Sequence, residues 1–264
     1  MRLFDSHCHL EDPEFEQDLP AICHRMAQNG VMAVMIVGID AARSQRAVAL
    51  AESLPGAWAA VGVHPHDASE CSEKVLENLQ ILARSPRVRA WGETGLDFNR
   101  MYSPRADQER WFARQLEIAR DLDLPLILHE RDSGGRLIEM LRAHHWSGRT
   151  GVVHCFSGTF EELAQYLAMD FYIGITGIVT HAQRGKDLRA MVPRIPAERL
   201  LVETDAPYLT PTPERNHHRR NEPAFVRSVL LKVAQVRGED PEALAAEVWN
   251  NTCRLFRLPK DALS

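Results

Sequence analysis

Short apolar runs alternate with longer segments of helical periodicity along this chain, and this alternation constrains its fold more than any other feature. Such alternation is typical of repeated β-α units around a parallel sheet. Eight runs rich in apolar and β-branched residues can be counted, at residues 2–8, 31–38, 58–63, 88–92, 124–128, 151–154, 171–175 and 200–204. Because eight β-α units close a barrel, we predict an α/β fold of the (β/α)8 TIM-barrel type rather than an open doubly wound sheet.

Several of the intervening segments carry signals for the start of a helix. Ser103 followed by Pro104 predicts a cap and a first turn before a long amphipathic segment. Thr159 with Glu162 three residues later predicts a capping box. Asp240, which also precedes a proline, predicts the start of the last helix. These starts lie between the apolar runs, where a barrel requires helices.

The length of the chain permits either two small domains or one barrel. It has 264 residues, of which 45% are hydrophobic and 25% charged, as in ordinary soluble globular proteins. No change of composition, flexible linker or internal repeat interrupts the series of apolar runs. We therefore predict a single domain over residues 1–264.

Charge and cysteine content limit the class of protein. Lys and Arg together number 31 against 36 Asp and Glu, a net charge of −5, so any binding to nucleic acid must depend on local cations. The five cysteines are scattered without a C-x-x-C pair, which argues against a disulfide framework and predicts a reducing, cytoplasmic location. The first ten residues contain Asp5, His7 and His9, and no run of 18 apolar residues occurs, so we expect no signal peptide, membrane partner or obligate protein partner.

Residues of metal-ligand type lie at the ends of the predicted strands, where a barrel carries its active site. Alternation along a strand turns His7 and His9 to the same side and Cys8 to the helices, and the same parity predicts that Cys155 faces outward. The residues at or just after strand ends are His7, His9, His64, Glu93, His129, His154 and Asp205. So many coincident strand ends predict a metal site rather than structural histidines.

Six of these residues, all except His64, form the predicted ligand set. Six ligands exceed what one catalytic zinc takes, so we predict two divalent metal ions. Glu93, whose carboxylate can use both oxygens, is placed to bridge them. Imidazole and carboxylate ligands are compatible with Mg²⁺, Mn²⁺ or Zn²⁺, and the residues alone do not choose between them. The sequence also does not decide whether a third ion binds near His64.

Seven sequence segments together resemble the TatD family of metal-dependent nucleases, and the resemblance extends from Phe4 to Phe256. They are residues 4–10 (FDSHCHL), 62–66 (GVHPH), 92–98 (GETGLDF), 153–158 (VHCFSG), 203–208 (ETDAPY), 219–223 (RRNEP) and 250–252 (NNT).

This resemblance implies a hydrolase of the amidohydrolase type that cleaves phosphodiesters with two divalent ions. His7, His9 and Asp205 would hold one ion, His129 and His154 the other, and Glu93 would bridge. The implied reaction is 3′ to 5′ exonuclease cleavage of single-stranded or damaged DNA, with RNA left open.

Catalytic and substrate-binding roles follow from this reading. Glu93 and Asp205 would act at the metal-activated water, and Asp205 can orient it. His64 would contact a phosphate or protonate the leaving group. Other substrate contacts are expected from phosphate-binding arginines and from aromatic residues that stack on bases. These candidates are Arg131, Arg219 and Arg220 for phosphate, and Tyr208 and Phe98 for bases.

Two alternatives are open at this point. The same metal-activated water attacks carbonyl groups, so the chain could be an acyl or amide hydrolase such as a D-aminoacyl-tRNA deacylase. Arginines at the rim do not separate these readings, because tRNA is also a polyanion. The other alternative is a binding protein whose metals only hold the barrel together. It is disfavoured because structural metal sites are coordinatively closed, whereas this ligand set leaves positions for water.

Overall fold

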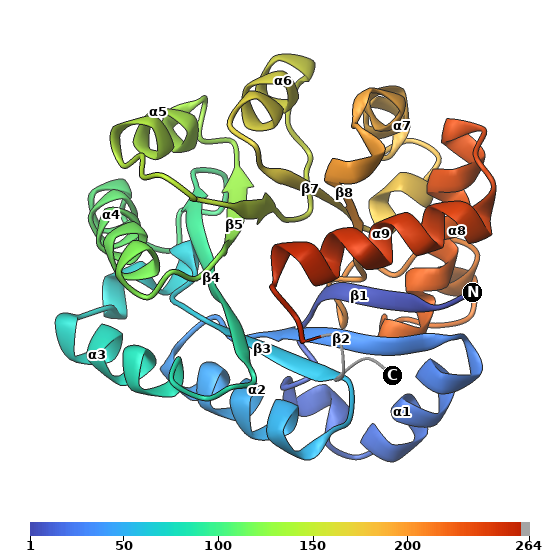
Figure 1. Ribbon diagram of the computed structural model, residues 1–264, viewed down its shortest axis with the longest axis horizontal. Coiled ribbons are helices and arrows are strands. Elements are labelled where there is room, and N and C mark those ends of the chain that lie inside the picture. The colour runs from blue at the N-terminus through green and yellow to red at the C-terminus, as the bar shows by residue number, and fades with distance from the viewer. Residues whose placement is uncertain (260–264) are drawn as a thin grey trace.

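The computed structural model describes residues 1–259, so residues 260–264 of the predicted domain lie outside the described part. Eight strands form one parallel sheet in the order β1 to β8, with the helices around it (Figure 1). This confirms the predicted (β/α)8 TIM barrel. The strands are β1 (Leu3–Cys8), β2 (Val31–Val37), β3 (Ala57–Val61), β4 (Val88–Asp97), β5 (Leu126–Arg131), β6 (Gly151–Val153), β7 (Tyr172–Ile175) and β8 (Leu200–Val202).

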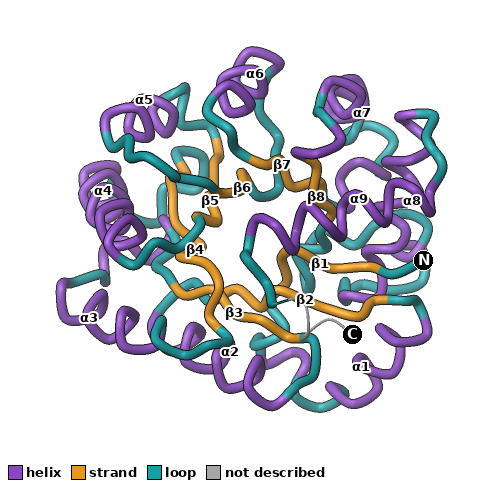
Figure 2. The backbone as a smooth tube through the Cα atoms, viewed as in Figure 1, coloured by secondary structure: helices purple, strands orange, loops and turns teal. Residues whose placement is uncertain are grey.

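The α-helices follow the strands and lie on the outside of the barrel (Figure 2). They are α1 (Leu19–Gln28), α2 (Ala41–Ser53), α3 (Glu73–Leu82), α4 (Arg105–Asp121), α5 (Arg136–Ala143), α6 (Phe160–Ala168), α7 (Lys186–Met191), α8 (Val226–Arg237) and α9 (Pro241–Leu255). No described helix has both the length and the apolar character needed to cross a membrane.

Two of the three predicted helix starts are confirmed. Thr159 and Glu162 form the capping box of α6, and the Asp240 side chain caps α9. The prediction for Ser103 is wrong, because Pro104 occupies the cap position of α4. The Ser103 hydroxyl instead donates to the carbonyl oxygen of His66 at 2.7 Å. This bond ties the loop before α4 to the loop after β3.

Two apolar cores lie on either side of the sheet. The outer core fills the space between strands and helices and includes Cys8, as the strand parity predicts. The inner core fills the barrel and is closed at the start of β1 by α9, whose Trp249 lies 5.7 Å from the ring of Phe4. Because apolar side chains close this end, the polar pocket lies at the carboxyl ends of the strands.

Strand β4 is longer than predicted and is irregular where it passes the site. The predicted strand ended at Gly92, but β4 continues to Asp97, so Glu93 lies within the strand rather than after it. Between Trp91 and Thr94 the pairing with β5 shifts by one residue, which is a β-bulge. At Gly95, where φ is +148°, a side chain would collide with the carbonyl oxygen of His129. The glycine therefore permits the close approach of β4 and β5.

The barrel is closed by hydrogen bonds between β1 and the segment after β8. The amide of Asp205 donates to the carbonyl oxygen of His7 at 2.9 Å, and the amide of His9 donates to Ala206 at 2.7 Å. Asp205 is thus held beside the two histidines of β1, although about 200 residues separate them in the chain.

Candidate metal centre

The structure brings all six predicted ligand residues together at the carboxyl end of the barrel. His7 and Glu93 belong to β1 and β4, and His129 belongs to β5, where the sequence had predicted that it follows the strand. The other three residues, His9, His154 and Asp205, lie just after β1, β6 and β8. Most of the six are almost fully buried. A closed parallel barrel directs these strand ends to one place.

The two carboxylate oxygens of Glu93 face two different groups of histidines. Oε2 lies 3.4 Å from His7 Nε2 and 3.9 Å from His9 Nε2. Oε1 lies 2.8 Å from His129 Nδ1 and 3.8 Å from His154 Nε2. Both groups, each with Glu93, have the spacing to hold a metal ion. Glu93 is therefore placed as a bridge.

Asp205 lies between the two groups on the pocket side. Its Oδ1 is 3.4 Å from His9 Nε2 and 3.8 Å from both His7 Nε2 and His154 Nε2. His7, His154 and Asp205 also form a set with metal-ligand spacing. One carboxylate oxygen thus reaches side chains of both groups.

The charges in the cluster favour a bound cation. Burial would raise the pKa of Glu93, but the imidazoles of His64, His154 and His129 outweigh it and hold this pKa well below the usual value. Burial likewise opposes ionisation of Asp205, and His154 and His9 lower its pKa. Two buried carboxylates are therefore ionised beside imidazole nitrogens, which is the donor set that divalent metals bind. The residues present fit metal ions.

Three of the four histidines have an oxygen atom beside one ring nitrogen, and for His9 and His129 this contact is a hydrogen bond. His9 Nδ1 lies 2.9 Å from the carbonyl oxygen of Val37, and His154 Nδ1 lies 2.9 Å from Glu203 Oε1. His129 uses its other nitrogen, because Nε2 lies 3.3 Å from Asp97 Oδ2. The other nitrogen of each ring faces the cluster and is the one that the ring would offer to a metal in place of a proton.

The sequence analysis missed Asp97 and Glu203. Both are fully buried acidic residues, and both lie inside the quoted segments 92–98 and 203–208. A carboxylate that close to a ligand could have been recognised as an orienting group. The contacts of Asp97 also raise the pKa of His129 to about 9, together with Glu93 and against the effect of burial.

His64 is fixed in one tautomer. Its Nδ1 accepts the backbone N–H of His66 at 3.0 Å, so a neutral ring carries its proton on Nε2. Burial, helped by the neighbouring His129, lowers the pKa of His64 to about 3 and keeps the ring neutral. Nε2 lies 3.1 Å from His129 Nδ1 and 3.4 Å from Glu93 Oε1, so its N–H faces the cluster. His64, His66 and His129 also form a group with the spacing to hold a metal ion.

The cluster opens into a pocket of about 1160 Å³, here called the central pocket. Four of the predicted substrate residues line it, namely His64, Arg131, Tyr208 and Arg219. The lining also includes Arg215 and His218 of the loop after β8, and His66, Arg100, Tyr102, His181 and Arg184, which the sequence did not single out. Cationic and aromatic side chains therefore surround the cluster.

Two of the expected substrate residues and one cysteine lie differently from the prediction. The guanidinium of Arg220 binds Asp18 at 2.6 Å and covers the ring of Phe15 outside the central pocket. Phe98 is also outside it and lies under Arg105. Cys155, predicted to face outward, lines the pocket, because β6 ends at Val153 and the parity of the strand does not extend to residue 155.

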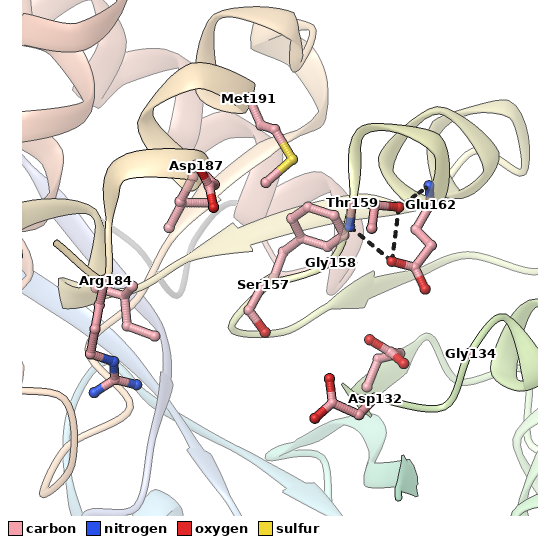
Figure 3. A pocket seen from close by; sticks show the side chains of 13 residues that line it. Asp132, Gly134, Ser157, Gly158, Thr159, Glu162, Arg184, Asp187 and Met191 are labelled. Carbon is pink, nitrogen blue, oxygen red and sulfur yellow. Dashed lines mark hydrogen bonds between the residues drawn. The ribbon is translucent and has the colours of Figure 1, made fainter. Parts of the chain in front are cut away.

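A second pocket of about 570 Å³ adjoins the central pocket and shares five residues with it, namely Glu130, Asp132, Ser157, Ile178 and Arg184. Figure 3 shows Asp132, Glu162 and Asp187 around it, with the Thr159–Glu162 capping bonds in its wall. Glu130 adds a further acidic residue to the lining, and Arg184 is the one arginine or lysine in it. This acidic pocket repels phosphate groups.

Comparisons with known proteins agree with the resemblance seen in the sequence. The model of the family "TatD related DNase" matches residues 4–257. A protein of Pectobacterium parmentieri named "3'-5' ssDNA/RNA exonuclease TatD" is 44% identical over 261 residues, which are 97% of this chain and 100% of the relative. A protein of the same name from Erwinia billingiae is 45% identical over 260 residues, with the same coverage.

The fold also matches a solved structure. The crystal structure of YJJV, a TatD homolog from Escherichia coli K12, superposes with a TM-score of 0.89 at 32% identity and covers 98% of this chain and 99% of that one. Sequence motifs, fold and cluster geometry therefore agree over the whole described barrel, and the chain belongs to the TatD-related DNase family.

Proposed function

We propose that this chain is a metal-dependent 3′ to 5′ exonuclease of single-stranded or damaged DNA, and also of RNA. The observation that carries the proposal is the geometry of Glu93, whose two oxygens each face a separate pair of histidines. The names of its relatives support the reaction and the substrate class.

Two divalent ions fit the cluster best. His7, His9 and Asp205 would hold one ion, His129 and His154 the other, and Glu93 would bridge. Mg²⁺, Mn²⁺ or Zn²⁺ bound there would supply a water made nucleophilic near neutral pH and positive charge at the phosphoryl oxygens. Asp205, whose Oδ1 reaches both groups, would orient that water.

His64 would bind the phosphate rather than transfer a proton. The Nε2–H of its neutral ring faces His129 Nδ1 and Glu93 Oε1, next to where a phosphoryl oxygen would lie once metals occupy the cluster. A pKa of about 3 means that the ring holds no second proton to give away at neutral pH. A hydrogen bond to a non-bridging oxygen is therefore its favoured contribution.

The rim of the central pocket would bind the rest of the substrate. Arg131 and Arg219 supply positive charge beside the cluster, whereas the chain as a whole carries a net charge of −5. Phosphates are therefore attracted to this pocket and not to the molecule at large. Tyr208 offers an exposed ring for a base. A cytoplasmic location remains a prediction from the scattered cysteines.

A labelled-substrate assay tests the proposal. The metal-stripped chain is incubated with 3′-labelled or 5′-labelled single-stranded DNA, and Mg²⁺, Mn²⁺ or Zn²⁺ is added in turn. We expect early release of the 3′ label, a shortening ladder from the 5′-labelled strand, and neither in the Glu93→Gln variant. Absence of cleavage with all three metals would contradict the proposal. Aminoacyl-tRNA would then be the next substrate, as a test of the acyl-hydrolase reading.

A further inference from the structure

The tyrosines of this chain fall into two pairs. Tyr166 and Tyr172 are buried, with 1% and 3% of their surface exposed. Tyr102 and Tyr208 are 64% and 50% exposed, and both line the central pocket. Exposing a large ring has a cost in water unless a ligand covers it. The placement of both exposed tyrosines at the metal cluster therefore points to a substrate contact.

The two exposed rings lie at opposite groups of the cluster. The ring of Tyr208 is 6.0 Å from that of His9, on the side of His7 and Asp205. The ring of Tyr102 is 4.7 Å from that of His66, which in turn is 6.0 Å from His129. A phosphate between the two groups would thus have one tyrosine on each side.

Both tyrosines belong to segments that are attached to the site. The amide of Tyr208 donates to the carbonyl oxygen of Asp205 at 2.8 Å, and its own carbonyl oxygen accepts from the Asn221 side chain at 2.6 Å. The residue after Tyr102 is Ser103, whose hydroxyl binds the His66 carbonyl oxygen. Hydrogen bonds therefore fix the backbone at both tyrosines while their rings stay exposed, so a base could stack on a ring whose position is fixed.

We propose that Tyr102 and Tyr208 stack on the two unpaired bases that flank the cleaved phosphate. This inference rests on the proposed nuclease function and specifies how the substrate is selected. Every base has a π-face, so such stacking is tolerant of sequence, and it is available only to bases that are not already stacked in a duplex. Arg100, whose Nη1 lies 3.4 Å from the Tyr102 hydroxyl, adds positive charge for the backbone beside the ring.

The acidic pocket narrows the path of the strand. It adjoins the central pocket, shares Glu130 and Asp132 with it, and adds Glu162 and Asp187 (Figure 3). Phosphate groups would be repelled from the side where Glu162 and Asp187 lie, and a strand that passes between the two tyrosines would avoid that side. Arg184 lines both pockets and Arg215 lines the central pocket, so both add positive charge beside the cluster.

Base deletion combined with mutation tests this inference. Single-turnover cleavage is measured on single-stranded DNA that is intact, abasic at the 3′-terminal nucleotide, or abasic at the next one. In the wild type we expect each deletion to slow cleavage at subsaturating enzyme by about tenfold. The Tyr102→Leu variant should cleave intact DNA about tenfold more slowly than the wild type, and one of the two base deletions should slow it no further. In the Tyr208→Leu variant, the other base deletion should have no further effect.

Three controls accompany the test. Tyr102→Phe and Tyr208→Phe keep the ring and should retain the wild-type response to both deletions. Phe160→Leu removes a ring that is 52% exposed but lines neither pocket, and it should change nothing. The metal content of the tyrosine variants should equal that of the wild type.

The outcomes separate the two proposals. If the wild type cleaves no DNA with any metal, the nuclease function fails, and this inference fails with it. The wild type could cleave DNA while each base deletion still slows both leucine variants as much as it slows the wild type. In that case the bases do not stack on these rings. The nuclease function then stands while the inference is overturned.

Discussion

Asp97 and His129 meet through the ring nitrogen that points away from the metal cluster. Asp97 Oδ2 lies 3.3 Å from His129 Nε2, while His129 Nδ1 lies 2.8 Å from Glu93 Oε1. The other oxygen of Asp97 accepts the backbone N–H groups of Asn99 and Arg100. These two bonds fix the carboxylate, and the carboxylate fixes which nitrogen of His129 can bind a metal.

Asp97→Asn should therefore weaken metal binding strongly. The amide oxygen would stay with the two backbone N–H groups, so the NH₂ group would face His129 Nε2 and require it to accept a hydrogen bond. His129 would then carry its proton on Nδ1, where the metal has to bind. We expect a loss of about 10- to 100-fold in metal affinity, measured by calorimetric titration of the metal-stripped chain.

Glu203→Gln is the matched control for that variant. In Glu203 one oxygen, Oε1, both accepts the Cys155 N–H and faces His154 Nδ1. An amide oxygen can keep both contacts, so this substitution should reduce metal affinity much less than Asp97→Asn. Equal losses in the two variants would show that the tautomer argument is incorrect.

Glu93→Gln should reduce metal content and activity together. The amide nitrogen can no longer accept, so one of the two histidine groups loses its shared carboxylate oxygen. Elemental analysis should give fewer ions per chain, while the circular dichroism spectrum should stay that of the wild type because both apolar cores are untouched. Full metal content with wild-type activity would show that Glu93 is not a metal ligand.

His64→Ala should slow catalysis without changing metal content. The Nε2–H donor is lost, and removing one such donor to a developing charge reduces kcat by about a hundredfold or more. Metal content is compared by elemental analysis, and kcat by the labelled-strand assay. If one ion per chain disappears with the side chain, His64 is a ligand and a third ion binds beside it.

Arg219→Ala should weaken the binding of single-stranded DNA and lower its dependence on salt. Each lost phosphate contact reduces the slope of log K against log salt concentration by about 0.7 for single strands. Fluorescence anisotropy with labelled DNA at several salt concentrations gives this slope. Arg220→Ala is the control, because its guanidinium is paired with Asp18 outside the central pocket. A lower slope in the Arg220 variant would contradict the structure.

Arg220→Ala should instead have a small effect on stability that depends on pH. A hydrogen bond from Arg220 lowers the pKa of Asp18, so the pair stabilises the fold above the ordinary carboxylate pKa and loses this contribution as the pH falls through the lowered value. Exposed pairs contribute about 0.2–1 kcal/mol. Thermal melting should show a lower Tm for the variant at pH 7 and a smaller difference near pH 3. An equal difference at both pH values would argue against the pairing.

Much of the site follows from local sequence patterns. Alternating apolar and helical segments indicate eight β-α units, and parallel strands in a closed barrel end at the same rim. Residues that follow strand ends, such as His154 and Asp205, must then lie near those of β1. For this reason the six candidate ligand residues could be predicted to lie together without knowing any distance.

Other features depend on residues far apart in the chain, which no local pattern shows. The bulge in β4 puts Glu93 inside the strand, because β4 must fit against β5. Arg220 is adjacent to Arg219, yet it turns to Asp18, about 200 residues away.

By itself, the sequence determined the barrel and the set of side chains at its rim, because strand periodicity and the chemistry of each side chain are properties of short segments. Only the tertiary structure decided which oxygen of Glu93 faces which histidines, which nitrogen of His129 is free, and which tyrosines stay exposed. Hydrogen-bond partners and burial are set by closure of the barrel, which brings β1 against the end of β8.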